Sequence, residues 1–234
     1  TQAMILTAAA AIAVFATLNL KSLAWNLRAY RAWVQTDAYA AFAKTNAQSQ
    51  VMALPLALAM SVNGLFILGL VFVPGLWSVI EYLFPLALVA FLAIGVLAFR
   101  LYGAFLGRVL GEGGFKCAAN NSFGQVLPAF AFAMIGVGLA APAALSTNAT
   151  IAGIALILSG FFLVTSVVIA LVAVALGLRS MLENGVAPEA APTLMIIVPL
   201  LAVLGILLLR QDHGLHTHFG TEAPAGAALS LLGK

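Results

Sequence analysis

Residues 120–145, NNSFGQVLPAFAFAMIGVGLAAPAAL, decide the fold because their opening pattern occurs once before in the chain. The pattern Asn-x-x-x-Gln-Val begins at Asn46 and again at Asn121, 75 positions later. Each copy leads to a proline, Pro55 or Pro128, and then to Ala-x-Ala-Met. Self-similarity at a fixed spacing indicates a tandem repeat of one structural unit.

A second pattern supports the repeat. Arg-x-x-x-Glu-x-Gly begins at Arg108 and again at Arg179, 71 positions later. Three acids, Asp37, Glu112 and Glu183, lie nine residues before the apolar segments that begin at Asn46, Asn121 and Pro192. We therefore predict three tandem units. On a continuing helix the Arg and Glu of each pair are four residues apart and could form an ion pair beside the turn.

The composition is that of a membrane protein. Charged residues make up 7% of the chain and hydrophobic residues 64%, whereas soluble domains have about 25% and about 45–50%. Four segments without a charged residue approach or exceed the roughly 20 residues that span a bilayer: 45–80, 82–99, 117–178 and 190–209. The single cysteine, Cys117, excludes an intrachain disulfide and a thiolate metal cage built by one chain.

The predicted fold class is all-α, a polytopic membrane protein built from tandem helical hairpins. We expect one transmembrane domain over residues 1–234, with spans at 3–20, 51–77, 79–105, 122–145, 151–178 and 192–209. The first span should continue through residues 21–44 as one long helix with an aromatic and basic belt. Because this first helix has no hairpin partner, we expect the chain to be part of a longer protein.

Basic residues predict the orientation in the lipid bilayer. Eight of them fall on one side of the predicted spans: Lys21, Arg28, Arg31, Lys44, Arg100, Arg108, Lys116 and Arg179. By the positive-inside rule this side is cytoplasmic, in a bacterial-type inner membrane. Arg210 and Lys234 are left on the outer side. Basic residues confined to loops report orientation, so we expect no nucleic-acid partner.

Prolines separate the spans into two classes. The second, fourth and sixth spans run outward and carry Pro55, Pro128 and Pro199, whereas the returning spans are plain apolar helices. A proline frees a backbone carbonyl, which is best tolerated where protein or water surrounds it. We therefore expect inner, proline-kinked helices around an axis and outer helices that face lipid. Helix packing alone explains the same prolines.

This pattern resembles the tellurite-resistance/slow-anion-channel (TehA-like) transporter superfamily. The similar stretches are 121–125, NSFGQ, and 192–199, PTLMIIVP. The resemblance implies hairpins around a central pore, assembly of identical chains such as a trimer, and a pore-blocking phenylalanine, for which Phe66, Phe130 and Phe132 are candidates. Residues 73–77, VPGLW, and 213–216, HGLH, resemble the TsoY-type membrane (seleno)protein family at least as well.

Polar side chains mark a candidate transport path. We expect Asn46, Gln50, Asn121 and Gln125 to form a polar cytoplasmic vestibule, with Asn63 deeper along the path. A buried amide needs a hydrogen bond, so Asn63 should have a protein partner or a water beside it. The alternative for Asn46 and Asn121 is that they cap the helices they precede.

Three histidines form the only titratable cluster. His213, His216 and His218 follow Asp212 just beyond the sixth span. They could belong to a solvated interfacial loop, hold a metal or haem, or act as a pH-sensitive gate. Gly214 is expected to interrupt a helix there, so the spacing does not enforce one face. We expect neither a cofactor nor a metal, and these histidines are weak metal candidates.

Two candidate functions remain, transport and electron transfer. The sequence has no phosphate-binding loop, Ser-His-Asp set or paired carboxylates in a plausible site, so we do not expect an enzyme. The first candidate is passive or secondary transport of a small anion. Spans without charged side chains suit a weakly binding anion path and argue against proton-relay pumping. The alternative is a membrane-anchoring or electron-transfer subunit with a His-bound cofactor.

Overall fold

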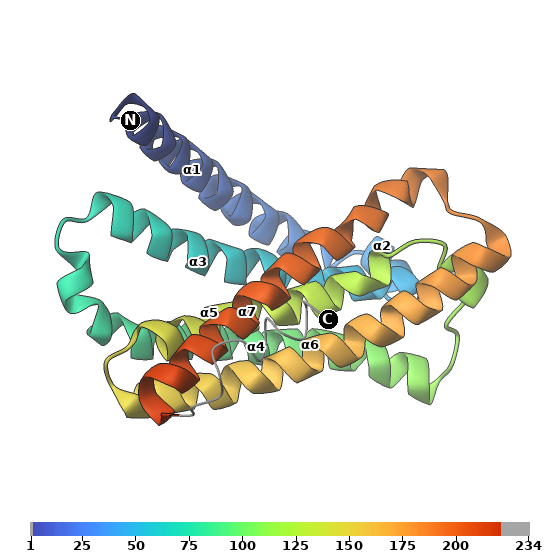
Figure 1. Ribbon diagram of the computed structural model, residues 1–234. Coiled ribbons are helices and arrows are strands. Elements are labelled where there is room, and N and C mark those ends of the chain that lie inside the picture. The colour runs from blue at the N-terminus through green and yellow to red at the C-terminus, as the bar shows by residue number, and fades with distance from the viewer. Residues whose placement is uncertain (1, 221–234) are drawn as a thin grey trace.

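A computed structural model of the chain describes residues 2–220, which form helices joined by short turns, with no strand among them (Figure 1). Six helices are long and apolar enough to cross a membrane, which confirms the predicted all-α class and supports an integral membrane protein. Their bounds are α1 Gln2–Trp33, α3 Ala53–Phe72, α4 Leu76–Gly111, α5 Leu127–Leu145, α6 Ala149–Asn184 and α7 Ile197–Phe219.

The helices alternate in direction, so their connections gather at two ends (Figure 1). At one end, α3 turns into α4 and α5 turns into α6 within a few residues. Gly75, with φ of 74°, makes the first turn possible because residues with a Cβ rarely adopt that conformation. Asn148 caps the second turn by accepting from the backbone N–H groups of Thr150 and Ile151. We call this the short-turn end, and the opposite one the junction end.

Helix α5 is the centre of the structure. It contacts α3, α4, α6 and α7, whereas α1 contacts α3 and has no buried residue. Glycines allow this close packing: a Cβ at Gly138 would lie 2.1 Å from the Phe91 ring of α4, and one at Gly136 would lie 3.0 Å from the Leu207 side chain of α7. Small residues let membrane helices approach closely, and here they let four neighbours surround α5.

The three helices that start at the junction end share a local design. Each follows a 3₁₀ segment: η1 Asn46–Met52 before α3, η3 Gly124–Val126 before α5 and η4 Pro188–Ile196 before α7. Pro55, Pro128 and Pro199 lie in the first turn of these helices. A proline in the first turn removes little intrahelical hydrogen bonding. These prolines therefore free few backbone carbonyls, so they give no reason to expect an inner position for their helices.

The first helix is shorter than predicted. It ends at Trp33, and a separate short helix, α2 Asp37–Phe42, follows. Thr36 begins α2 by accepting from the backbone N–H of Tyr39, and Trp33 stacks edge-on against Tyr39 and Phe42. The prediction of one continuous helix to Lys44 was wrong because side-chain capping and aromatic contacts favour a turn there.

The last helix is longer than predicted. It passes through Gly214 without interruption and ends at Phe219. A Cβ at Gly214 would lie 2.5 Å from the Ala143 carbonyl oxygen, so the glycine is needed where α7 meets α5. The expected helix break at Gly214 was therefore wrong: this glycine permits close packing of two helices.

Candidate functional site

Asn46 and Gln125 link η1 to the segments that precede α5 at the junction end. The Asn46 side chain pairs with the backbone of Lys116, donating to its carbonyl at 2.8 Å and accepting from its N–H at 3.2 Å. Gln125 donates from Nε2 to the Asn46 carbonyl at 2.8 Å. The cap of η1 is the preceding residue, Thr45, so the alternative of Asn46 as a helix cap does not describe its side chain.

Arg108 joins the end of α4 to the start of η1. Its Nε donates to Gln48 Oε1 at 2.8 Å, and its Nη2 donates to the Thr45 carbonyl at 2.9 Å. The guanidinium also lies 5.8 Å from the centre of the Phe105 ring. Arg108 therefore connects two helices, and the ion pair with Glu112 that its spacing suggested is not formed.

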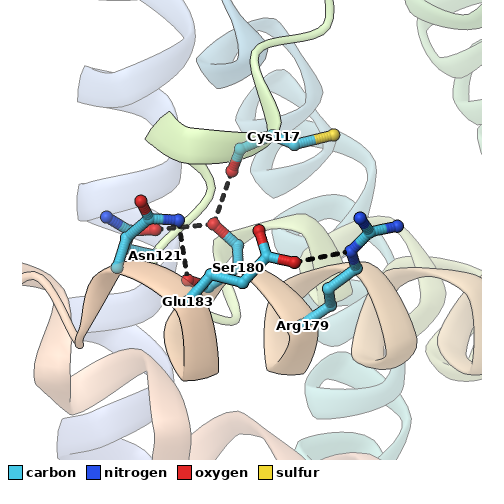
Figure 2. Close-up of polar contacts among 6 residues, drawn as sticks. Cys117, Asn121, Arg179, Ser180 and Glu183 are labelled. Atoms are coloured by element: carbon cyan, nitrogen blue, oxygen red, sulfur yellow. Dashed lines mark hydrogen bonds and ion pairs between the residues drawn. The ribbon is translucent and has the colours of Figure 1, made fainter.

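Ser180 makes the corresponding connection between α6 and the segment that precedes α5. Its hydroxyl lies 2.6 Å from Asn121 Oδ1 and 2.5 Å from the Cys117 carbonyl (Figure 2). A hydroxyl has one proton, so it donates to one of these oxygens at a time. Beside it, Arg179 and Glu183 form the predicted ion pair at 2.9 Å on the exposed side of α6 (Figure 2).

The four predicted vestibule residues all lie at the junction end, but they make different contacts. Asn46, Asn121 and Gln125 take part in hydrogen bonds between segments that are far apart in the chain. Gln50 is exposed and lines a groove of about 620 Å³ between α1 and α3. Three of these amides therefore link distant segments at the junction end.

A second cavity lies among α3, α4, α5 and α7. Its volume is about 270 Å³, and its lining includes the predicted path residues Asn63 and Phe66. Phe132 is fully buried against Phe99 and Phe162, and Phe130 packs on the hydrophobic core. Of the three candidate phenylalanines, Phe66 is the one that faces this cavity.

Asn63 has a protein partner. Its Nδ2 donates to the Ala59 carbonyl at 3.1 Å, one turn earlier in α3, and lies 3.7 Å from the Met134 sulfur. The Nδ2 group is therefore satisfied by protein atoms. Because the partner is a protein group and not a water, this contact does not itself support conduction.

Arg210 is the functional candidate that the sequence did not reveal. It lines the cavity, is half-buried, and donates from Nη1 to the Val137 carbonyl at 2.7 Å. Val137 is eight residues from the last residue of α5, which is about 12 Å along a helix. The ion pairs among residues 2–220 are Arg179–Glu183 and His216–Asp212, so no described carboxylate pairs with Arg210.

Arg210, which we expected just beyond the sixth span, lies within helix α7. The polar run after Leu209 ends the apolar pattern, but the helix continues and remains packed on α5 at Gly214. The next residue, Gln211, donates to Ser159 of α6 at 3.0 Å. Contacts with two neighbouring helices thus hold Arg210 against the cavity.

The three histidines do not converge. His216 lies 3.4 Å from Asp212 within α7, and His218 Nε2 lies 2.8 Å from the Ser146 carbonyl. His213 is exposed. Residues 2–220 contain no group of three or more His, Cys, Asp or Glu side chains that could hold a metal ion.

Glu81 fastens the turn between α5 and α6 at the short-turn end. Its carboxylate accepts from the Ser146 hydroxyl at 2.8 Å and from the backbone N–H and hydroxyl of Thr147. Sequence reasoning gave Glu81 no role in this turn because Ser146 and Thr147 lie more than 60 residues away in the chain.

Comparison with known proteins finds no family model, curated protein or solved structure that matches this chain.

Proposed function

We propose that this protein is a transporter or channel for a small anion, passive or secondary, and that Arg210 attracts the anion. The observation that carries the proposal is the half-buried guanidinium in a cavity between membrane-type helices, with no described carboxylate to neutralise it. An anion entering the cavity would supply the missing negative charge.

The energetic cost of the arginine supports a functional role. An arginine at the centre of a membrane helix costs about 2.5–3.5 kcal/mol on insertion scales, so such residues usually serve a pathway or a binding site. One hydrogen bond to a carbonyl offsets part of this cost, since hydrogen bonds to charged groups contribute about 1.5–3 kcal/mol. An anion that binds in the cavity would offset more.

The arrangement of helices is compatible with the proposed tandem hairpins. In this proposal α3/α4 and α5/α6 are two units, α7 begins a third, and α3, α5 and α7 line the path. The shared 3₁₀ entries support the repeat. The cavity supports the proposal that α3, α5 and α7 line the path, because all three helices contribute to its lining. Helix α4 contributes to the lining as well. Assembly of identical chains, as in TehA-like proteins, remains part of this proposal.

The geometry favours transport over the electron-transfer alternative. A His-bound cofactor would need imidazoles that converge on one point. Instead, His216 lies beside Asp212 and His218 beside Ser146.

Flux measurements with purified protein in liposomes test the proposal. For whichever of chloride, nitrate and benzoate the wild type carries, replacing Arg210 with Gln should reduce the flux by about 10- to 100-fold, the effect of losing one charge-assisted hydrogen bond. The matched control is Arg179→Gln, which removes an exposed arginine at the junction end. Anion flux that is equal in wild type, R210Q and R179Q would contradict the proposal.

The proposed orientation has a simple test in the native chain. Cys117 is the single cysteine and is exposed at the junction end, which we propose to be cytoplasmic. A membrane-impermeant maleimide should therefore label Cys117 in inside-out membrane vesicles and not in intact cells. Labelling of intact cells alone would reverse the orientation.

A further inference from the structure

The cavity that contains Arg210 combines one cationic group with a mostly apolar lining. Arg210 and Asn63 supply its polar groups, and Phe66, Phe84 and Met134 are among its apolar walls. We propose that the anion is a monocarboxylate with a short apolar body, and that its carboxylate pairs with Arg210. This inference rests on the proposed function and narrows it to one substrate class.

The charge of the cavity matches a monovalent anion. Among the lining residues from the described part of the chain, Arg210 alone is charged, and it carries one positive charge. A monocarboxylate would neutralise it. A dicarboxylate or phosphate dianion would place a second negative charge among apolar side chains, where an unpaired charge is strongly disfavoured.

The guanidinium is free to hold a planar carboxylate with two hydrogen bonds. A guanidinium has five N–H groups, and the contact with the Val137 carbonyl occupies one of them. Among residues 2–220, no other hydrogen bond from Arg210 is formed. The remaining donors can present a fork that matches the two oxygens of a carboxylate.

The volume and the walls favour an organic anion. A cavity of about 270 Å³ equals about nine water molecules at roughly 30 Å³ each, so chloride or nitrate would leave most of it unfilled. Apolar walls cannot replace the hydration shell of a small inorganic ion, but they pack well against a hydrocarbon or aromatic body. Phe91 contributes a wall because its ring lies against Gly138, where a Cβ would clash.

Binding to the purified protein tests the substrate class without requiring transport. Benzoate is the probe, phthalate tests a second charge, benzamide tests the need for charge, and nitrate tests the need for an apolar body. Titration calorimetry should show saturable benzoate binding at least about tenfold tighter than that of the other three ligands. Equal binding of phthalate, benzamide or nitrate would overturn the proposal.

Substitutions at Arg210 and at Ala141 probe the charge and the free space of the cavity. R210Q and R210K should both weaken benzoate binding, because neither side chain offers the guanidinium fork. Ala141→Leu should fill part of the cavity and weaken benzoate more than nitrate, whereas Ala202→Leu, at an exposed position of α7, should change neither. Unchanged benzoate affinity in R210Q and A141L, with melting temperatures like wild type, would overturn the site.

Flux and binding together separate the two proposals. Nitrate or chloride flux without benzoate binding would reject the monocarboxylate and leave anion transport standing. Benzoate binding without flux of benzoate, nitrate or chloride would leave the site standing and reject transport.

Discussion

Arg108 and Arg210 occupy the same kind of sequence position, the polar end of an apolar run, yet their surroundings differ. Arg108 donates to Gln48 and to the Thr45 carbonyl and lies near the Phe105 ring, at the junction end. Within residues 2–220, Arg210 makes one hydrogen bond, to the Val137 carbonyl, and it faces a cavity lined mostly by apolar side chains.

The difference separates a structural arginine from one that is available to a ligand. The donors of Arg108 are directed at fixed oxygens of a neighbouring segment, so its charge connects helices. Arg210 keeps most of its donors unused within the described chain, in a place where an unneutralised charge is costly. Changes to Arg108 should therefore alter stability, and changes to Arg210 should alter anion binding.

The largest effect is expected when the support of Arg210 is disturbed. Gly214→Ala would place a Cβ 2.5 Å from the Ala143 carbonyl oxygen, and backbone must move to relieve the clash. Overpacking of this kind costs about 1–3 kcal/mol, and the shift should also reduce anion flux by moving Arg210 away from the cavity. Melting temperature and flux in liposomes measure the two effects.

Gly205→Ala is the matched control, because a Cβ at Gly205 meets no atom within 4 Å. It should be neutral or stabilise the helix by up to about 1 kcal/mol. If G214A and G205A behaved alike, the close contact between α5 and α7 would not control the position of Arg210.

A smaller effect is expected at the Arg108 connection. Arg108→Gln removes hydrogen bonds to Gln48 and Thr45, and we expect a loss of about 1–2 kcal/mol in unfolding free energy because the site is partly solvent-exposed. Denaturant titration of the detergent-solubilised protein would measure it. A variant as stable as wild type would show that Arg108 is not the structural member of the pair.

The Ser180 connection at the junction end should show the smallest effect on stability. Ser180→Ala removes the hydroxyl that lies between Asn121 and the Cys117 carbonyl, and one such hydrogen bond contributes about 1 kcal/mol. Arg179→Gln, one residue earlier, should change stability little because its ion pair is exposed. A larger loss in R179Q than in S180A would reverse the assigned roles.

Much of the helical framework was predictable from sequence. Charge-free segments located six helices because a bilayer span needs a long apolar run. Asn46 and Asn121, which occupy matching places in the two sequence patterns, lie at the same end, and the four-residue spacing predicted the Arg179–Glu183 pair.

The site was less predictable because it depends on contacts between distant residues. Arg108 and Arg179 match in sequence, but Arg108 reaches Gln48 and Thr45 across the fold, whereas Arg179 remains on the helix surface. Likewise, the apolar run ends at Leu209, whereas α7 continues because Gly214 fits against Ala143. The available signal for the longer helix was Gly214, a glycine within a polar run whose other residues are compatible with a helix.

One paired measurement tests the central claim most directly: anion flux and melting temperature for R210Q and R108Q, prepared side by side in the same lipid. The account predicts that R210Q loses flux while its melting temperature stays at or above that of wild type, because removing a buried charge relieves its desolvation. R108Q should melt lower and keep its flux per folded molecule. Normal flux in a well-folded R210Q protein would contradict the claim that Arg210 attracts the transported anion.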